Sequence, residues 1–255
     1  MTVYDIYRHV DTLFPFSSAA EYDNVGLLIG DMNAPVSRVL VALDCTKSAA
    51  EKAKEIGANL IVTHHPVIFE PLKQVLSDSV IHFCIKNGIN VISAHTNVDM
   101  GKGGINDKLC EMLSLTDIEP LDCDGFTIRK GVLATPVSAE ELAKCCETLF
   151  KMPIRFTDGR REIKSVAVCS GSGGGMLSAV IDAKCDAYVT SDVKHSQFIS
   201  AYDNDLSIFD CGHFNTEDII VEPIKNTLSA AFPQTDFVTY HGKEISNTCD
   251  FGGKK

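Results

Sequence analysis

Two adjacent histidines, His64 and His65, follow an apolar run at residues 60–63 and stand directly before Pro66. Inside a regular strand they would point to opposite faces, because side chains alternate with a period of two. At a strand end, where the proline disfavours continuation, both rings can turn into one cavity. Imidazoles this close in sequence are poorly placed to chelate one ion, so the pair is suited to two neighbouring metal ions.

A second pair of side chains has helical spacing. His213 and Glu217 are four residues apart, so on a helix both project from one face. The two oxygens of a carboxylate can bridge two cations, which a neutral imidazole cannot do. A solvated surface pair would explain the same spacing. His95 and Asp99 follow another apolar run, at residues 89–93, where a hydrogen-bonded loop is the alternative. The recurrence of such residues at the ends of apolar runs favours a metal site.

The segments that must position these residues alternate between strand and helix. Strands are predicted at 38–44, 59–65 and 89–95, and helices at 1–14, 46–58, 77–88 and 104–115. The second half repeats the alternation, with strands at 127–136, 165–169, 186–192 and 205–213, a helix at 138–150 and a long helix from about Phe214. This order predicts an α/β fold with mostly parallel sheets. A composition break places the boundary of two α/β lobes near Asp124, giving lobes 1–124 and 125–255, with residues 210–225 returning to the metal site. Ligands of such sheets bind beyond the carboxyl ends of the strands.

Composition narrows the classes of function. The 255 residues carry a net charge of −11, which argues against non-specific nucleic-acid binding. No apolar run is long enough to span a bilayer and the first 14 residues lack signal-peptide features, so we expect a cytoplasmic protein that does not enter membranes. The ten cysteines contain no CxxC pair, and we expect reduced thiols that pack as small hydrophobic side chains.

A glycine-rich segment offers another interpretation. Gly171, Gly173, Gly174 and Gly175 follow a predicted strand and precede a helix, as in a dinucleotide-binding fingerprint. Met176 occupies the position where that fingerprint needs Gly or Ala for close helix packing, which argues against a bound dinucleotide. The alternative is a tight turn whose amides face the cleft and can hold an anion.

Four segments together resemble the Nif-three-like family, also known as GTP cyclohydrolase I type 2 homologues or dinuclear metal-centre proteins. They are residues 21–31 (EYDNVGLLIGD), 62–69 (VTHHPVIF), 93–107 (SAHTNVDMGKGGIND) and 212–217 (GHFNTE). Tyr22 stands where the family often has tryptophan. The resemblance implies two lobes with a metal pair in the cleft between them, and a homo-oligomer, with the toroidal hexamer of the family expected. It implies these metal ligands: His64, His65, Asp99, His213 and a bridging Glu217.

The resemblance also implies a reaction class. Two divalent ions, with Zn or Fe expected and Mn, Co or Ni as alternatives, lower the pKa of water and stabilise an oxyanion, so hydrolysis is expected. The substrate would be a small molecule, and a nucleotide such as GTP is the first candidate. His95 or His195 could transfer protons and Lys194 could neutralise a phosphate. The alternative is a hexameric metal-binding or regulatory platform without catalysis.

Overall fold

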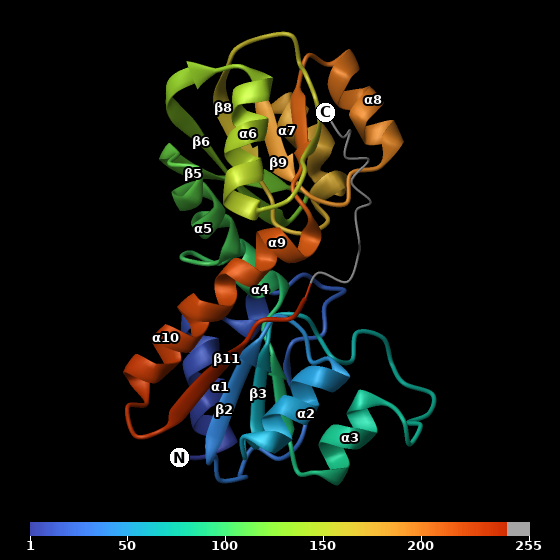
Figure 1. Ribbon diagram of the computed structural model, residues 1–255, viewed down its shortest axis with the longest axis vertical. Coiled ribbons are helices and arrows are strands. Elements are labelled where there is room, and N and C mark those ends of the chain that lie inside the picture. Colours follow the sequence, from blue (N-terminus) through green and yellow to red (C-terminus); the bar gives the residue numbers. More distant parts are fainter. Residues whose placement is uncertain (244–255) are drawn as a thin grey trace, which may run out of the picture.

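The computed structural model describes residues 1–243, which form two α/β lobes stacked along the long axis (Figure 1). Each lobe contains one β-sheet, and short helices lie where the lobes meet. The predicted α/β fold with two lobes is confirmed. No helix among residues 1–243 is both long and apolar enough to cross a bilayer.

The first lobe is built on a five-stranded sheet in the order β1-β4-β3-β2-β11. Four strands are parallel, and β1 runs antiparallel to β4 at one edge. The strands are β1 (Gly26–Ile29), β2 (Arg38–Ala42), β3 (Leu60–Thr63), β4 (Asn90–Ser93) and β11 (Asp236–Tyr240). Helices α1 (Val3–Leu13), α2 (Lys47–Glu55), α3 (Val80–Lys86) and α10 (Val221–Ala231) cover this sheet.

Alternation of apolar residues along the strands determines which helices lie on each face. Val39 and Val41 of β2 pack in the cluster that contains residues of α1 and α10. Leu40, between them, packs with alanines of α2 and with Cys84 of α3. Because both faces are covered, the parallel strands are buried on both sides. This explains why they appear in the sequence as continuous apolar runs.

The second lobe contains a six-stranded sheet in the order β5-β6-β8-β9-β10-β7. Here the prediction of a mostly parallel sheet is wrong, since only the β8–β9 and β9–β10 pairs are parallel. The long hairpin of β5 and β6 and the edge strand β7 supply the antiparallel pairs. The strands are β5 (Thr116–Cys123), β6 (Phe126–Val137), β7 (Arg155–Thr157), β8 (Ile163–Val168), β9 (Ala187–Thr190) and β10 (Ser207–Asp210). The helices are α6 (Ala139–Phe150), α7 (Leu177–Asp182) and α8 (His195–Asp203).

The predicted division of the chain into lobes 1–124 and 125–255 is wrong in two places. Strand β5 precedes it but pairs with β6 of the second sheet. Strand β11 comes near the end of the described chain but lies beside β2 of the first sheet, with α10 packed on it. The chain therefore enters the second lobe at about residue 116 and returns to the first lobe after α9 (His213–Glu217). Helices α4 (Thr96–Met100) and α5 (Ile105–Met112) also lie where the lobes meet.

Two further expectations can be compared with the structure. The long helix predicted from about Phe214 is interrupted, because a 3-10 turn, η3 (Asp218–Ile220), separates α9 from α10. Two more 3-10 turns are η1 (Phe16–Ser18) and η2 (Gly173–Met176). Nine cysteines within residues 1–243 are free thiols, and seven of them are buried, as expected for small hydrophobic side chains. Cys249 lies outside the described residues.

Candidate metal centre

The carboxyl ends of parallel strands from both sheets meet between the lobes. In the first lobe, β2, β3 and β4 end just before Asp44, His64 and Ala94. In the second lobe, β8, β9 and β10 end just before the segments that carry Gly171, Asp192 and His213. Loops beyond strand ends are free to present side chains, which is where such sheets bind ligands. The two sheets therefore place their polar loops against each other across one cleft.

One group of possible ligands is deeply buried and consists of His64, Asp99 and Glu217, which we call the first position. Nε2 of His64 is 3.7 Å from Oδ1 of Asp99 and 3.9 Å from Oε1 of Glu217. These separations are too long for hydrogen bonds. They are in the range expected of atoms that each lie about 2 Å from a shared ion. Ala94 accepts a hydrogen bond from Nδ1 of His64 at 3.0 Å, which leaves Nε2 buried and without a hydrogen-bond partner among the described residues.

A second group lies nearer the surface and consists of His65, His213 and Glu217, which we call the second position. Oε2 of Glu217 is 2.8 Å from Nε2 of His65 and 3.0 Å from Nε2 of His213. The two oxygens of Glu217 therefore face different groups of imidazoles. The structure thus brings together all five residues predicted as metal ligands, and Glu217 stands where a bridging carboxylate would stand.

In each histidine around the cleft, the ring nitrogen Nδ1 forms a hydrogen bond within the protein. A hydrogen bond from Nδ1 fixes each ring and leaves Nε2 to face the other ligand groups, as is usual for metal-binding histidines. Three of these bonds go to carboxylates: His65 donates to Asp44 (2.7 Å), His95 to Asp23 (2.9 Å) and His213 to Asp192 (2.7 Å). Serine 170 similarly donates from Oγ to Oδ1 of Asp99 at 2.8 Å. These hydrogen bonds therefore fix the orientation of the possible ligand side chains.

Burial controls protonation at the first position. Removal from water lowers the pKa of His64 to about 3, because the charged ring is poorly solvated there. Burial, together with the charge of Glu217, raises the pKa of Asp99 to about 7. His64 is consequently a neutral imidazole near pH 7, which is the form that binds metals.

At the second position, neighbouring carboxylates overcome burial. Burial alone would disfavour the charged form of His65, but Asp44 and Glu217 raise its pKa to about 10. The bond with Glu217 is the main cause that raises the pKa of His213 to about 9. Burial opposes the charge of Glu217, yet His213 and His65 hold its pKa well below the usual range. Both rings therefore carry a positive charge beside the carboxylate near pH 7.

His95 belongs to the same cluster, whereas Lys194 and His195 do not. The ring of His95 lies with its centre 5.0 Å from that of His64 and 5.6 Å from that of His65, and it forms a third possible ligand group with them. Lys194 and His195 are exposed at the start of α8, outside the three groups. Their catalytic roles stay predictions. Asp192 from the same segment does reach the site, through His213.

Sequence reasoning missed Asp44 and Asp23 as partners of the histidines. Asp44 follows strand β2 in the same way that the histidines follow β3, so its position at a strand end was a usable signal. Asp23 comes from a loop and is 72 residues away from His95, so no local spacing indicates the contact. It also accepts hydrogen bonds from the backbone and hydroxyl of Thr96, which fixes the start of α4.

The glycine-rich segment contributes a tight turn beside the candidate metal centre. The amide of Gly171 donates to Oγ1 of Thr216, and that of Gly173 donates to Oγ1 of Thr190. These two amides are therefore engaged by the protein itself. Gly171 has φ +56°, and a Cβ placed on it would lie 2.0 Å from Oε1 of Glu217. A glycine here lets the backbone approach the carboxylate closely.

A cavity of about 1250 Å³ lies against the second position. His65 and His213 form part of its wall, which also carries the cations of Lys47 and Lys243 and the carboxylates of Asp44 and Glu51. It is large enough for a small-molecule substrate beside the cluster.

Replacing Asp44 by Asn tests whether the carboxylate orients His65. The amide can still contact Nδ1 but no longer raises the basicity of the ring. We expect metal affinity at the second position to fall by about 10- to 100-fold, with little change at the first position. Metal titration with a competing chelator measures this. The matched control is Glu51→Gln, which changes another acidic residue lining the cavity, and equal losses in both variants would contradict the assignment.

Comparison with known proteins agrees with this architecture. The model of the family described as Duf34/NIF3 (NGG1p interacting factor 3) matches residues 1–246. A GTP cyclohydrolase 1 type 2 homolog from Clostridium perfringens is 34% identical over 229 residues, covering 85% of this chain and 87% of that protein. Reduced HcgD from Methanocaldococcus jannaschii superimposes with a TM-score of 0.82 at 29% identity, covering 94% of this chain and 97% of that one. A Bacillus cereus protein related to NIF3 has the same fold, with a TM-score of 0.88 at 22% identity and coverage of 98% and 99%. The chain belongs to the Duf34/NIF3 family, as its four sequence segments predict.

Proposed function

We propose that this protein binds two divalent metal ions and acts as a metal-dependent hydrolase on a nucleotide or a related small molecule. One observation carries the proposal: Oε1 of Glu217 faces His64, whereas Oε2 faces His65 and His213. The unpartnered Nε2 of His64 supports it, because a buried polar atom without a partner is costly unless a ligand satisfies it.

The chemistry of the donor atoms fits divalent transition metals. Imidazole nitrogens with carboxylate oxygens suit Zn or Fe, which we propose, and also Mn, Co or Ni. His64, Asp99 and Glu217 would hold one ion, and His65, His213 and Glu217 the other. When bound, such ions supply Lewis-acid chemistry and activate water near neutral pH.

The protein's own residues would handle substrate and protons. The cavity beside His65 and His213 would hold the substrate, with Lys47 and Lys243 facing an anionic group. His95 lies beside both positions and is held by Asp23, so it is placed to accept or donate a proton at Nε2. The names of relatives as GTP cyclohydrolase 1 type 2 homologs support a nucleotide as the first substrate to test.

Metal content by plasma mass spectrometry tests the proposal first. The protein should be purified without chelators and without a polyhistidine tag, and we expect about two ions per chain. Turnover is then measured on a panel of nucleotides and small esters or amides, beginning with GTP. Two ions without turnover would leave a metal-binding platform as the better account. No metal, even after reconstitution with Zn, Fe, Mn, Co and Ni, would contradict both.

Metal binding at the second position is expected to release protons. With their raised pKa values of about 10 and 9, His65 and His213 are both protonated at pH 7, and metals bind only the neutral ring. Affinity should therefore rise with pH until about pH 10, most steeply below about pH 9, and about two protons should leave per ion at pH 7. Calorimetry in buffers of different ionisation enthalpy counts these protons. A binding heat that is independent of the buffer would contradict the prediction.

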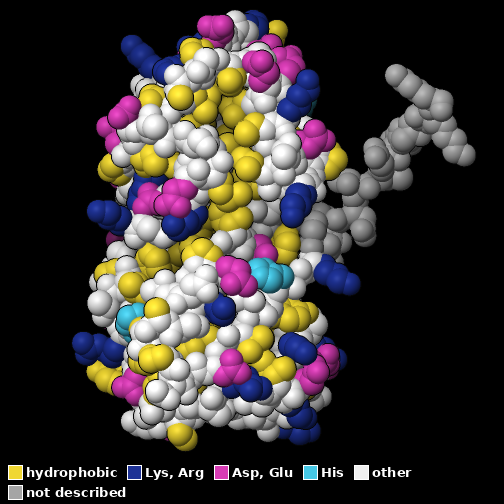
Figure 2. Space-filling view, turned by 60° about the vertical axis from the view of Figure 1, so that its left-hand side comes forward, with side chains coloured by type: hydrophobic (Ala, Val, Ile, Leu, Met, Phe, Trp, Pro, Cys, Tyr) yellow, Lys and Arg dark blue, Asp and Glu magenta, His cyan; other side chains and the backbone are white. Residues whose placement is uncertain are grey.

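We propose that the protein is a homo-oligomer, with a hexamer expected. Strand β5 lies at the edge of its sheet and most of its side chains are exposed, a situation that proteins usually protect. Figure 2 shows hydrophobic side chains gathered in a band along the upper lobe and the waist of the molecule. Light scattering coupled to size exclusion tests this, with an expected mass of six 27.7 kDa chains. A monomeric mass would contradict it.

A further inference from the structure

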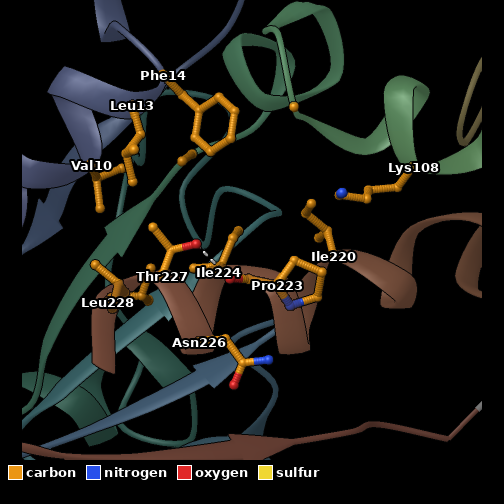
Figure 3. Close-up of a pocket in the computed structure, with 13 residues that line it drawn as sticks. Val10, Leu13, Phe14, Lys108, Ile220, Pro223, Ile224, Asn226, Thr227 and Leu228 are labelled. Atoms are coloured by element: carbon orange, nitrogen blue, oxygen red, sulfur yellow. Dashed lines mark hydrogen bonds between the residues drawn. The ribbon is translucent and has the colours of Figure 1, made fainter. Parts of the chain in front are cut away.

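A second cavity, of about 320 Å³, lies apart from the metal centre and has a different chemistry (Figure 3). Its wall is mostly apolar and comes from α1, from β3, from the end of β4 and from α10. The side chains that shape it include Val10, Phe14, Val62, Ala94, Ile220 and Leu228. None of its lining residues belongs to the three possible ligand groups.

The cavity is nevertheless adjacent to the segments that carry the metal centre. Val62 lies in β3, two residues before His64. The carbonyl of Ala94 accepts the hydrogen bond that fixes His64. Ile220 follows Glu217 by three residues. An occupant of this cavity would therefore pack against the backbone that holds both metal positions.

The polar groups at the cavity define the chemistry of an occupant. Lys108 is the one charged side chain among the lining residues described, and Figure 3 shows its ammonium group directed toward Ile220. Glu111 pairs with Lys108 at 2.8 Å and is exposed, so it competes for the ammonium without filling the cavity. Thr227 and Asn226 are exposed on α10 at the edge of the cavity.

We propose that this cavity binds an amphiphilic anion, namely an aliphatic carboxylate with a chain of about ten carbons. The chain would occupy the apolar interior, where water would find few hydrogen-bond partners. The carboxylate would meet Lys108. The volume lies at the lower end of the range of about 300–1,000 Å³ for small-molecule sites, which fits one such chain.

Calorimetry with three probes of equal chain length tests the head group. Decanoate, decanol and decylammonium are titrated below their micelle concentrations into the full-length protein. We expect saturable binding of one decanoate per chain, weaker binding of decanol and the weakest binding of decylammonium. Lys108→Gln should weaken decanoate about fivefold, the scale of an exposed ion pair, and leave decanol unchanged. Glu111→Gln frees the ammonium and should tighten decanoate.

A blocking variant tests the location. Thr227→Trp introduces a ring from an exposed position on α10, and because the chain has no tryptophan its fluorescence is the only tryptophan signal. Blue-shifted emission shows that the ring is buried, as it must be if it fills the cavity, and decanoate binding should then fall at least tenfold. Ala230→Trp, also exposed on α10 but outside the cavity, is the control and should bind normally.

Several results would overturn the proposal. These are no binding of decanoate to the parent protein, equal binding of decylammonium, or unaltered binding in Thr227→Trp with a buried ring. A changed oligomeric state in Thr227→Trp, with no decanoate binding to the parent, would assign this surface to contact between copies instead. The titration is repeated on metal-free protein, so the cavity and the metal centre can each fail without the other.

Discussion

Glu217→Ala is expected to empty both metal positions, whereas His64→Ala or His65→Ala mainly empties one. The reason is geometric, because each oxygen of Glu217 faces a different position and no other described carboxylate is placed between them. Loss of an indirect partner typically costs about 10- to 100-fold in metal affinity, so loss of a shared ligand should cost more at each position. Metal content per chain, measured after dialysis against a weak chelator, gives the result directly.

A second variant separates ligation from folding. Glu217→Gln keeps the shape of the side chain but has one oxygen, so we expect at most one ion. Glu217→Ala is also expected to lower the free energy of unfolding, because His65 and His213 lose a buried partner. Circular dichroism checks that this variant still folds. Glu222→Ala is the matched control, since this carboxylate is exposed and bonds to Thr239 and His241. Two tightly held ions in Glu217→Ala would show that Glu217 is not the bridge.

The sequence was sufficient to bring the five predicted ligands together because each follows a local rule. His64 and His65 come after a continuous apolar run, which is typical of a buried parallel strand. His213 and Glu217 have helical spacing, and a short helix does form there. Strands β3 and β4 are parallel and end at the same edge of one sheet, so His64, His65 and Asp99 are expected to meet. His213 and Glu217 follow a strand of the other sheet, and their place in the same cluster was predicted from the resemblance to the family.

The errors arose where pairing over long distances decides the structure. Strand β11 pairs with β2 although about 200 residues of chain separate them, and its short sequence does not identify its partner. Strand β5 looks hydrophilic because it is an exposed edge strand, so it lacked the apolar pattern of a buried one. The contact of Asp23 with His95 likewise depends on a loop whose course no local spacing fixes. Local periodicity therefore predicted the elements better than their partners.

The glycine-rich segment forms the tight turn that was predicted as the alternative to a dinucleotide site. Its glycines resemble a nucleotide-binding turn, yet in the structure Gly171 leaves room for Glu217 of the candidate metal centre. Its positive φ of +56° adds a second requirement, because a residue with a Cβ is strained in that conformation. Gly175, in the same turn, has open space around its α-carbon and does not have a positive φ. A side chain is therefore expected to be harmful at Gly171 and tolerated at Gly175.

Gly171→Ala is expected to disrupt the metal centre, while Gly175→Ala is expected to be harmless. The new methyl group would lie 2.0 Å from Oε1 of Glu217 and 3.2 Å from Nε2 of His213, so both side chains must move. Backbone strain and overpacking together should lower the free energy of unfolding by about 1–3 kcal/mol and reduce metal content at both positions. Gly175→Ala should change stability by less than about 1 kcal/mol and keep the metals. Denaturant unfolding and metal analysis on the two variants measure both effects. If Gly171→Ala kept two ions and the parent's stability, the prediction would be contradicted. The candidate metal centre would then not depend on the close approach of this turn to Glu217.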